Sequence, residues 1–296
     1  MTLLLGLPAL AAIAAGGIVW KWSNQSRADL AARLLAATWM LATLTIVTAI
    51  ALYAVAWMVP AEHALWCRQL LGHSADHRPV AGVILLSVLT VVSLRVGWVT
   101  RKIVRMWRAE VLGRSCLDIE QSDIAYAFSV PQVFRKRSLE RGSIVVSTAM
   151  LDSLTEPERS ALFAHERAHL RYGHHRYLLT GQVLVAVLPP LRPMINRLSW
   201  LLERWADETA AREVGDRRVV ATAIAHAALS TTSRQTPMFL AFGSDSVVTR
   251  VEAMLQPPRS RSIAVSVALM LSVTTAALAA LTQLHHLVSL VGQMAR

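Results

Sequence analysis

Four long apolar runs constrain the fold of this chain more than any other feature of its sequence. Each is long enough to cross a bilayer as a helix, which takes about 20 apolar residues. Inside a bilayer every backbone polar group needs a partner, so such runs must be helical. The chain is also 54% hydrophobic and only 17% charged, which is too apolar for a soluble protein. We therefore predict a mainly α, multi-pass membrane protein with transmembrane helices at residues 3–20, 34–59, 80–99 and 263–284.

The basic residues predict how these helices are oriented. Five of them follow the third run, with a single acid among them: Arg101, Lys102, Arg105, Arg108 and Arg114. Lys and Arg gather on the cytoplasmic flanks of membrane helices, so we expect the third helix to end in the cytoplasm. Counting along the chain then places both termini outside the cell. The same preference accounts for the net charge of +11, and we expect no direct nucleic acid binding because no nucleic-acid-reading motif is present.

The middle of the chain differs in character, because charged residues become frequent and the long apolar runs stop. Short β-branched segments predict strands at residues 124–130 and 143–147, which can pair as a hairpin. Within the same region, residues 177–195 are apolar but short and proline-containing, so we expect a re-entrant or interfacial segment. The sequence thus predicts a membrane region with three helices, a cytoplasmic α+β domain, and a last membrane helix with a short tail, at residues 1–114, 115–260 and 261–296 respectively.

A well-delimited helix is predicted over residues 156–172. Thr155 and Glu158 have the spacing of a capping box at its start, and Gly173 suits its end. The helix contains the pattern His-Glu-x-x-His, whose members are His165, Glu166 and His169. Two histidines four residues apart share one helix face and can bind one metal ion. The acid beside them can take the proton of a metal-activated water, and this combination is typical of a zinc-dependent peptidase.

A catalytic zinc site takes three protein ligands and one water, so a third ligand is needed. Glu203 is the best candidate because it lies on a separate helix, predicted at residues 198–214. Asp207 lies one turn later on the same face and could hold the N–H group of a ligating imidazole. A rival is His175, which stands where the third histidine of His-Glu-x-x-His-x-x-Gly-x-x-His would be. That pattern needs a glycine where this chain has Tyr172, so we favour Glu203.

These residues resemble the membrane-embedded zinc peptidases of the BlaR/MecR family and, more distantly, the HtpX and CAAX-protease-like peptidases. The resemblance covers residues 125–255. It rests on a strand segment at 144–148, a Leu-x-x-Leu-Thr-x-x-Glu lead-in at 151–158, the His-Glu-x-x-His motif and the pattern Glu-x-x-x-Asp that begins at Glu203. The three apolar runs before the motif and one after it are similar to the BlaR arrangement, which also has its zinc domain in the cytoplasm.

The resemblance implies a gluzincin-type centre in which His165, His169 and Glu203 hold Zn²⁺. In such a centre Glu166 is the catalytic base and Asp207 supports one of the histidines. Peptide hydrolysis also requires a hydrogen-bond donor for the oxyanion, and the candidates here are His226 and Arg250.

Two further features lie outside this ligand set. Arg250 stands in Thr249-Arg250-Val251-Glu252, which is similar to the arginine-bearing segment of HtpX-like domains, although the usual His-Pro before it is absent. His174 and His175 are expected to form a polar patch at the end of the motif helix, where the helix dipole favours cations.

The resemblance implies an integral-membrane zinc endopeptidase that cleaves a cytoplasmic or juxtamembrane protein. A regulatory role is expected, in which the peptidase cuts a transcriptional repressor or itself. BlaR-type chains carry an external β-lactam sensor after the last helix, and only a short tail follows here, so we expect no β-lactam signal. Two alternatives are an HtpX-like peptidase for membrane protein quality control and a non-enzymatic membrane scaffold. The expected partners are a protein or peptide substrate and the lipid bilayer.

Overall fold

The computed structural model describes residues 2–23, 27–58, 79–113, 127–130, 143–146, 148–232 and 244–256, together with single helical positions between 267 and 285. Helices dominate these residues, which confirms the predicted mainly α class. The one sheet within them is an antiparallel pair of short strands, β1 (Ala127–Val130) and β2 (Ser143–Val146), with Ala127 opposite Val146. Both strands fall within their predicted ranges, and they lie against the motif helix.

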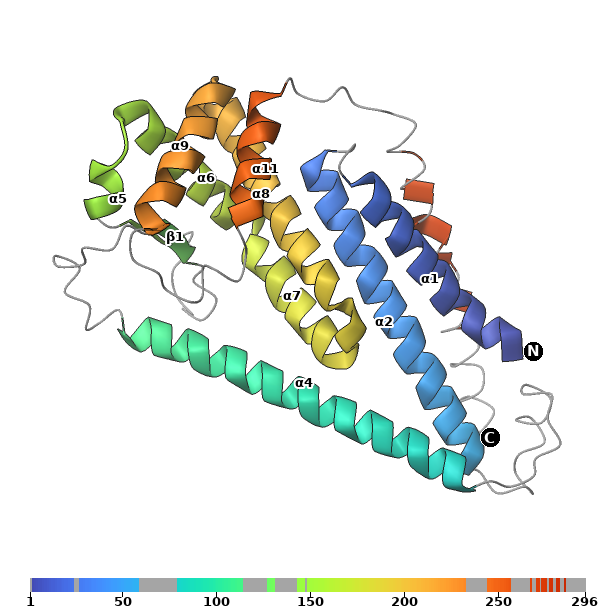
Figure 1. Cartoon of the computed structure of the whole chain (residues 1–296). Coiled ribbons are helices and arrows are strands. Elements are labelled where there is room, and N and C mark those ends of the chain that lie inside the picture. The colour runs from blue at the N-terminus through green and yellow to red at the C-terminus, as the bar shows by residue number, and fades with distance from the viewer. Residues whose placement is uncertain are drawn as a thin grey trace.

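Three long helices cover the first three predicted membrane runs, except that residue 59 at the end of the second run lies outside the described residues. The helices α1 (Thr2–Trp22) and α2 (Ala28–Met58) lie side by side, and α4 (Pro79–Gly113) contacts α2 and passes beneath the helices of residues 156–214 (Figure 1). Small side chains of α1 and α2 make their contact close, since Ala12, Ala15 and Ala42 are all buried there. The helix α4 continues well past the predicted end at residue 99 and includes part of the basic cluster, because no proline or glycine lies between residue 99 and Gly113.

Within the described residues, Ala28–Ile50 is the stretch whose length and apolar character suit a membrane crossing. In the 18-residue window that meets this test, 56% is buried against other parts of the protein. The fourth predicted run, at residues 263–284, lies largely outside the described residues. The four-helix topology and its orientation therefore stay predictions.

The motif helix α6 (Glu156–Tyr172) has the predicted bounds, and its caps explain why. At its start the backbone N–H of Thr155 donates to the carboxylate of Glu158 over 2.9 Å, which is half of a capping box. At its end Gly173 adopts a left-handed conformation with φ of 62°, which a residue with a side chain rarely accepts. The next helix, α7 (His174–Val187), begins directly after this glycine, so the chain turns sharply at one residue.

The short helix η3 (Pro189–Leu191) leads into α8 (Arg192–Val214), which begins six residues before the predicted start. Pro193 lies in the first turn, where a missing N–H costs nothing, so it does not end a helix there. Together α7 and η3 occupy most of the segment predicted to be re-entrant or interfacial. They pack against each other, and α7 also contacts α2, α4 and α8. That this segment is re-entrant or interfacial stays a prediction.

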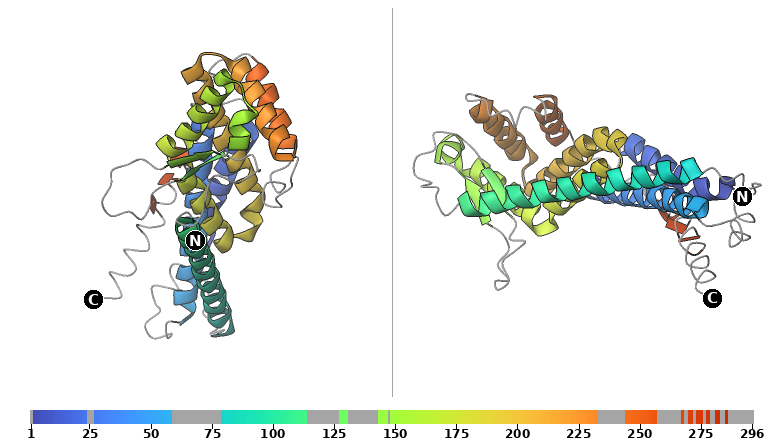
Figure 2. Two further views of the ribbon diagram at one scale, coloured as in Figure 1. Left: turned by 90° about the vertical axis from the view of Figure 1, so that its left-hand side faces the viewer. Right: turned by 90° about the horizontal axis from the view of Figure 1, so that it is seen from below.

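The helix α8 packs against the N-terminal helices with one half and against the helices around the motif with the other. Its first half shares an apolar core with α1 and α2 that includes Leu35, Trp39, Leu198, Leu201 and Trp205. Its second half packs against α6 and, with it, against α9 (Arg217–Thr232) and α11 (Ser244–Leu255). Figure 2 shows the result: α1 and α2 lie at one end of the elongated molecule, and α9, α11 and the short α5 (Thr148–Asp152) lie at the other.

Candidate metal centre

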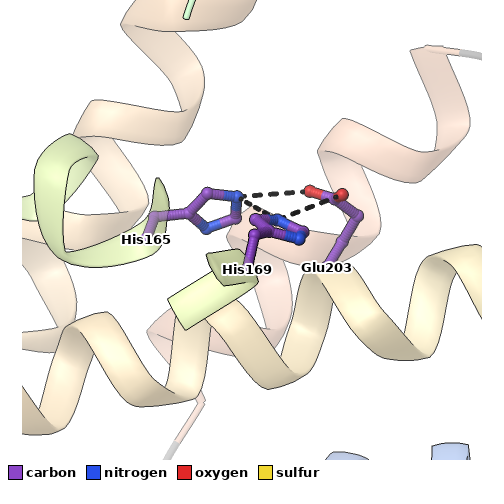
Figure 3. A group of neighbouring side chains, drawn as sticks. All are labelled: His165, His169 and Glu203. Atoms are coloured by element: carbon purple, nitrogen blue, oxygen red, sulfur yellow. Dashed lines mark hydrogen bonds and ion pairs between the residues drawn. The ribbon is translucent and has the colours of Figure 1, made fainter. Parts of the chain in front are cut away.

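Two imidazoles of α6 and one carboxylate of α8 meet at a single point (Figure 3). The Nε2 atoms of His165 and His169 are 3.0 Å apart. The carboxylate oxygens of Glu203 lie 3.4 Å from Nε2 of His165 and 3.5 Å from Nε2 of His169. Small buried side chains, among them Ala164 and Ala210, allow α6 and α8 to approach closely enough for this contact.

The two imidazoles and the carboxylate suit a tetrahedral zinc ion. At Zn–N and Zn–O distances of 2.0–2.2 Å, two tetrahedral ligand atoms lie about 3.4 Å apart. The two nitrogens are 3.0 Å apart, and each lies 3.4 or 3.5 Å from one of the two carboxylate oxygens of Glu203, which is close to this value. Two imidazole nitrogens and one carboxylate oxygen are also a donor set that zinc prefers, and three protein ligands leave the fourth position for water. The residues present therefore suit a catalytic zinc ion.

Asp207 fixes the orientation and the tautomer of His165. Its Oδ1 lies 2.9 Å from Nδ1 of His165 and the carboxylate is fully buried. A proton held on Nδ1 leaves the lone pair of Nε2 for a metal. This arrangement places the predicted supporting acid in contact with one of the predicted histidines.

Arg250 of α11 joins the two carboxylates of α8. Its Nε and Nη2 donate to the two oxygens of Asp207 over 2.8 and 2.7 Å, and its Nη1 lies 3.1 Å from Oε2 of Glu203. Burial would raise the pKa of Asp207, but the charge and hydrogen bonds of Arg250 outweigh burial and lower it to about 2. Arg250, with His169 and His165, likewise holds the pKa of Glu203 well below its usual value against the effect of burial. Both acids are therefore ionised at neutral pH.

These carboxylates make the centre attractive to positive charge. Burial would lower the pKa of His165, but its hydrogen bonds to Asp207 and Glu203 raise it to about 10. Burial dominates at His169, together with the neighbouring charges of His165 and Arg250, and lowers its pKa to about 4. The pair of imidazoles thus carries one positive charge between them. The same field favours a divalent cation at the point where their Nε2 atoms converge.

His174 is the residue of this region that sequence reasoning missed. We expected it to belong to a polar patch, and that expectation is wrong, because the ring is only 1% exposed. Its Nδ1 lies 2.9 Å from Nδ1 of His169, and burial lowers its pKa to about 3, so the ring is neutral. The available signal was Gly173, since a glycine that reverses the chain directly after the motif brings the next residue back towards it.

The other predicted site residues occupy different places. Glu166 is buried at 7% exposure beside His165 on α6, and its charge contributes to the field on Arg250. His175 lies in the first turn of α7 and is not a member of the His-His-Glu group. His226 pairs through Nδ1 with Glu158 over 2.9 Å, near the start of α6 and about two turns before His165. Its predicted role as oxyanion donor stays a prediction, as does that of Arg250, whose guanidinium already contacts two carboxylates.

Replacing Arg250 with leucine should destabilise the folded protein, because Asp207 would remain buried without its counter-charge. Removing one partner of a buried ion pair typically costs about 3–5 kcal/mol. The apparent unfolding temperature of the purified protein should therefore fall by several degrees, whereas Arg212→Leu, at an exposed arginine of α8, should change it little. Equal unfolding temperatures for the two variants would contradict this account of Arg250.

Comparison with known proteins adds one match. The sequence model of peptidase family M48 matches residues 93–241, just over half of the chain. That range includes the second half of α4, both strands, and every helix from α5 to α9, so it contains His165, His169, Glu203 and Asp207. Arg250 lies beyond it. No curated protein sequence and no solved structure matches the chain.

Proposed function

The chain belongs to peptidase family M48, a metallopeptidase family, and from this premise we propose that it is an integral-membrane zinc endopeptidase. In this proposal His165, His169 and Glu203 hold the zinc ion and Glu166 is the catalytic base. The observation that carries the proposal is the convergence of two Nε2 atoms and one carboxylate within 3.0–3.5 Å of one another.

The proposed chemistry divides peptide hydrolysis among these side chains. A bound zinc ion lowers the pKa of its water and polarises the substrate carbonyl. Glu166 accepts the proton of the attacking water and passes it to the leaving amine. Asp207 keeps the proton of His165 on Nδ1, and Arg250 keeps the carboxylates of Glu203 and Asp207 ionised. The contacts of Asp207 and Arg250 support the tasks proposed for them.

We further propose that the substrate is a cytoplasmic or juxtamembrane protein. The helix that carries Glu203 and Asp207 packs its first half on the apolar core of α1 and α2. Trp205, which stands between the two acids, belongs to that core. A catalytic centre on such a helix should lie close to the surface of the bilayer that α2 crosses. The resemblance to BlaR/MecR peptidases favours a regulatory substrate, such as a repressor or the peptidase itself.

The proposed membrane organisation comprises three helices before the zinc domain and one after it, with the domain in the cytoplasm and both termini outside. The apolar surface of α4 supports this proposal. Several of its large apolar side chains are more than half exposed, and soluble proteins rarely expose so many together: Val83, Ile84, Val91, Leu94 and Trp98. A lipid environment would cover them. We accordingly retain residues 1–114, 115–260 and 261–296 as the proposed divisions of the chain.

A comparison of proteomes would test both the peptidase activity and its proposed regulatory role. Membrane and cytosolic fractions of cells that carry the wild-type protein or Glu166→Gln would be compared, with Glu156→Gln as a control at an exposed acid of the same helix, far from the zinc ligands. One or two proteins that accumulate uncut in the Glu166→Gln cells would support a regulatory peptidase. Accumulation of many damaged membrane proteins would favour quality control. Identical proteomes in all three strains would favour the non-enzymatic scaffold and contradict the proposal.

The proposed orientation predicts that Cys67 and Cys116 lie on opposite sides of the membrane. The basic cluster from Arg101 to Arg114 places the end of the third helix in the cytoplasm, so Cys116 should be inside and Cys67 outside. A membrane-impermeant thiol reagent on intact cells should label Cys67 and spare Cys116, and permeabilised cells should show labelling of both. Labelling of Cys116 alone on intact cells would invert the topology and place the zinc domain outside.

A further inference from the structure

We propose that His174 is a positioning residue for the metal centre: it accepts a hydrogen bond from Nδ1 of His169 and thereby presents Nε2 of His169 to the metal. The inference rests on the proposed zinc site and adds a residue to it. It is carried by the contact of 2.9 Å between the two Nδ1 atoms and by the burial of His174, whose ring is only 1% exposed.

The direction of this hydrogen bond follows from the geometry of ligation. Two ring nitrogens 2.9 Å apart form a hydrogen bond only if one carries a proton and the other offers a lone pair. An imidazole that binds a metal through Nε2 carries its proton on Nδ1, so His169 is the donor. His174 must then be the acceptor, with its own proton on Nε2. The other histidine ligand, His165, also uses its Nδ1 for a supporting contact, in this case with Asp207.

Aromatic neighbours hold the His174 ring in the orientation that this bond needs. Its centroid lies 4.8 Å from the ring of Trp205 and 6.1 Å from the ring of Tyr172, which it stacks against at 20°. Its Nε2 is buried and has no hydrogen-bond partner among the described residues. Within the described part of the chain, the polar contact that orients the ring is therefore the bond through Nδ1, and Gly173 places the ring beside His169 by reversing the chain.

The use of an imidazole acceptor has an electrostatic reason. Three acids already lie near the centre, Glu166, Glu203 and Asp207, and one arginine offsets them. A carboxylate in the place of His174 would add another buried negative charge, which would need a further cation beside it. A neutral ring accepts the hydrogen bond from Nδ1 of His169 and needs no further cation. The two ligands are thus supported by different groups, a carboxylate behind His165 and an imidazole behind His169.

Two substitutions separate hydrogen bonding from packing. In His174→Asn the amide oxygen can take the place of Nδ1 as acceptor, but the aromatic contacts are lost. In His174→Phe the ring contacts remain and the acceptor is lost. The equilibrium constant for zinc dissociation, measured by competition with a chelator, should rise about 10- to 100-fold in His174→Phe and clearly less in His174→Asn. The unfolding temperature of the zinc-free protein should instead fall more in His174→Asn than in His174→Phe, because it depends on the ring contacts. The same two substitutions at the neighbouring His175 should leave zinc binding almost unchanged.

The hydrogen bond between His169 and His174 can also be tested in the wild-type protein, where the result does not depend on whether a variant folds. Long-range ¹H–¹⁵N spectra of the zinc-loaded protein with labelled histidine should show His174 protonated on Nε2 and unprotonated on Nδ1. A proton on Nδ1 of His174 would overturn the inference. So would zinc binding by His174→Phe that equals the wild type, or binding by His174→Asn that is weaker than by His174→Phe. A wild-type protein that binds no zinc would instead refute the proposed function, so the two failures are distinguishable.

Discussion

Replacing Glu166 with glutamine should abolish peptide-bond cleavage and leave zinc bound. The carboxamide has the shape of the carboxylate but cannot accept the proton of the attacking water. Loss of a general base typically lowers the rate about 10²- to 10⁴-fold. The ligands should not move, because Glu166 is not a member of the His-His-Glu group and the substitution changes almost no volume at this buried position.

Metal analysis and a cleavage assay on one purified sample would measure both effects. A matched control is Glu156→Gln on the same helix, because that side chain is 84% exposed and lies at the opposite end of α6 from the ligands. The control should keep both activity and zinc. Full activity in Glu166→Gln would remove Glu166 from the catalytic role, and loss of zinc in that variant would show that its carboxylate supports the ligands instead.

Local signals explain which parts of this structure the sequence could predict. The bounds of α6 were predicted because a capping box and a left-handed glycine act within a few residues of the helix ends. The pairing of His165 with His169 follows from the helical repeat alone. Glu203 is predictable as a ligand because it lies on a separate helix with Asp207 one turn later on the same face. The structure brings Glu203 to both histidines and Asp207 to His165.

Tertiary contacts explain what the sequence could not predict. Arg250 reaches Asp207 across 43 residues, so no local pattern indicates that it neutralises the acids of α8. The burial of His174 depends on Trp205 of α8 and on Tyr172, which come together only in the folded chain. A proline is compatible with a helix start as well as with a helix end, and in the first turn of α8 Met194 packs against the core of α1 and α2. In each case long-range packing decided between local alternatives.

The roles of Glu203 and His175 can be separated by metal binding. Glu203→Ala should lose zinc, because the centre would keep only two protein ligands where a catalytic site takes three. His175→Ala should keep zinc, because His175 lies in the first turn of α7 outside the His-His-Glu group. Asp207→Ala should fall between them and bind zinc about 10- to 100-fold more weakly, since it removes the group behind His165 but no ligand.

Zinc per protein after dialysis against a weak chelator would give this order directly. The matched control is Glu213→Ala, an acid of the same helix that pairs with Arg167 at the surface and should retain zinc as the wild type does. The order expected for zinc retention is His175→Ala, then Asp207→Ala, then Glu203→Ala. If Glu203→Ala kept its zinc while His175→Ala lost it, the third ligand would come from the chain just after the motif helix. A centre of that kind would not need Glu203, and the pairing of Arg250 with the two acids of α8 would then serve the stability of the fold alone.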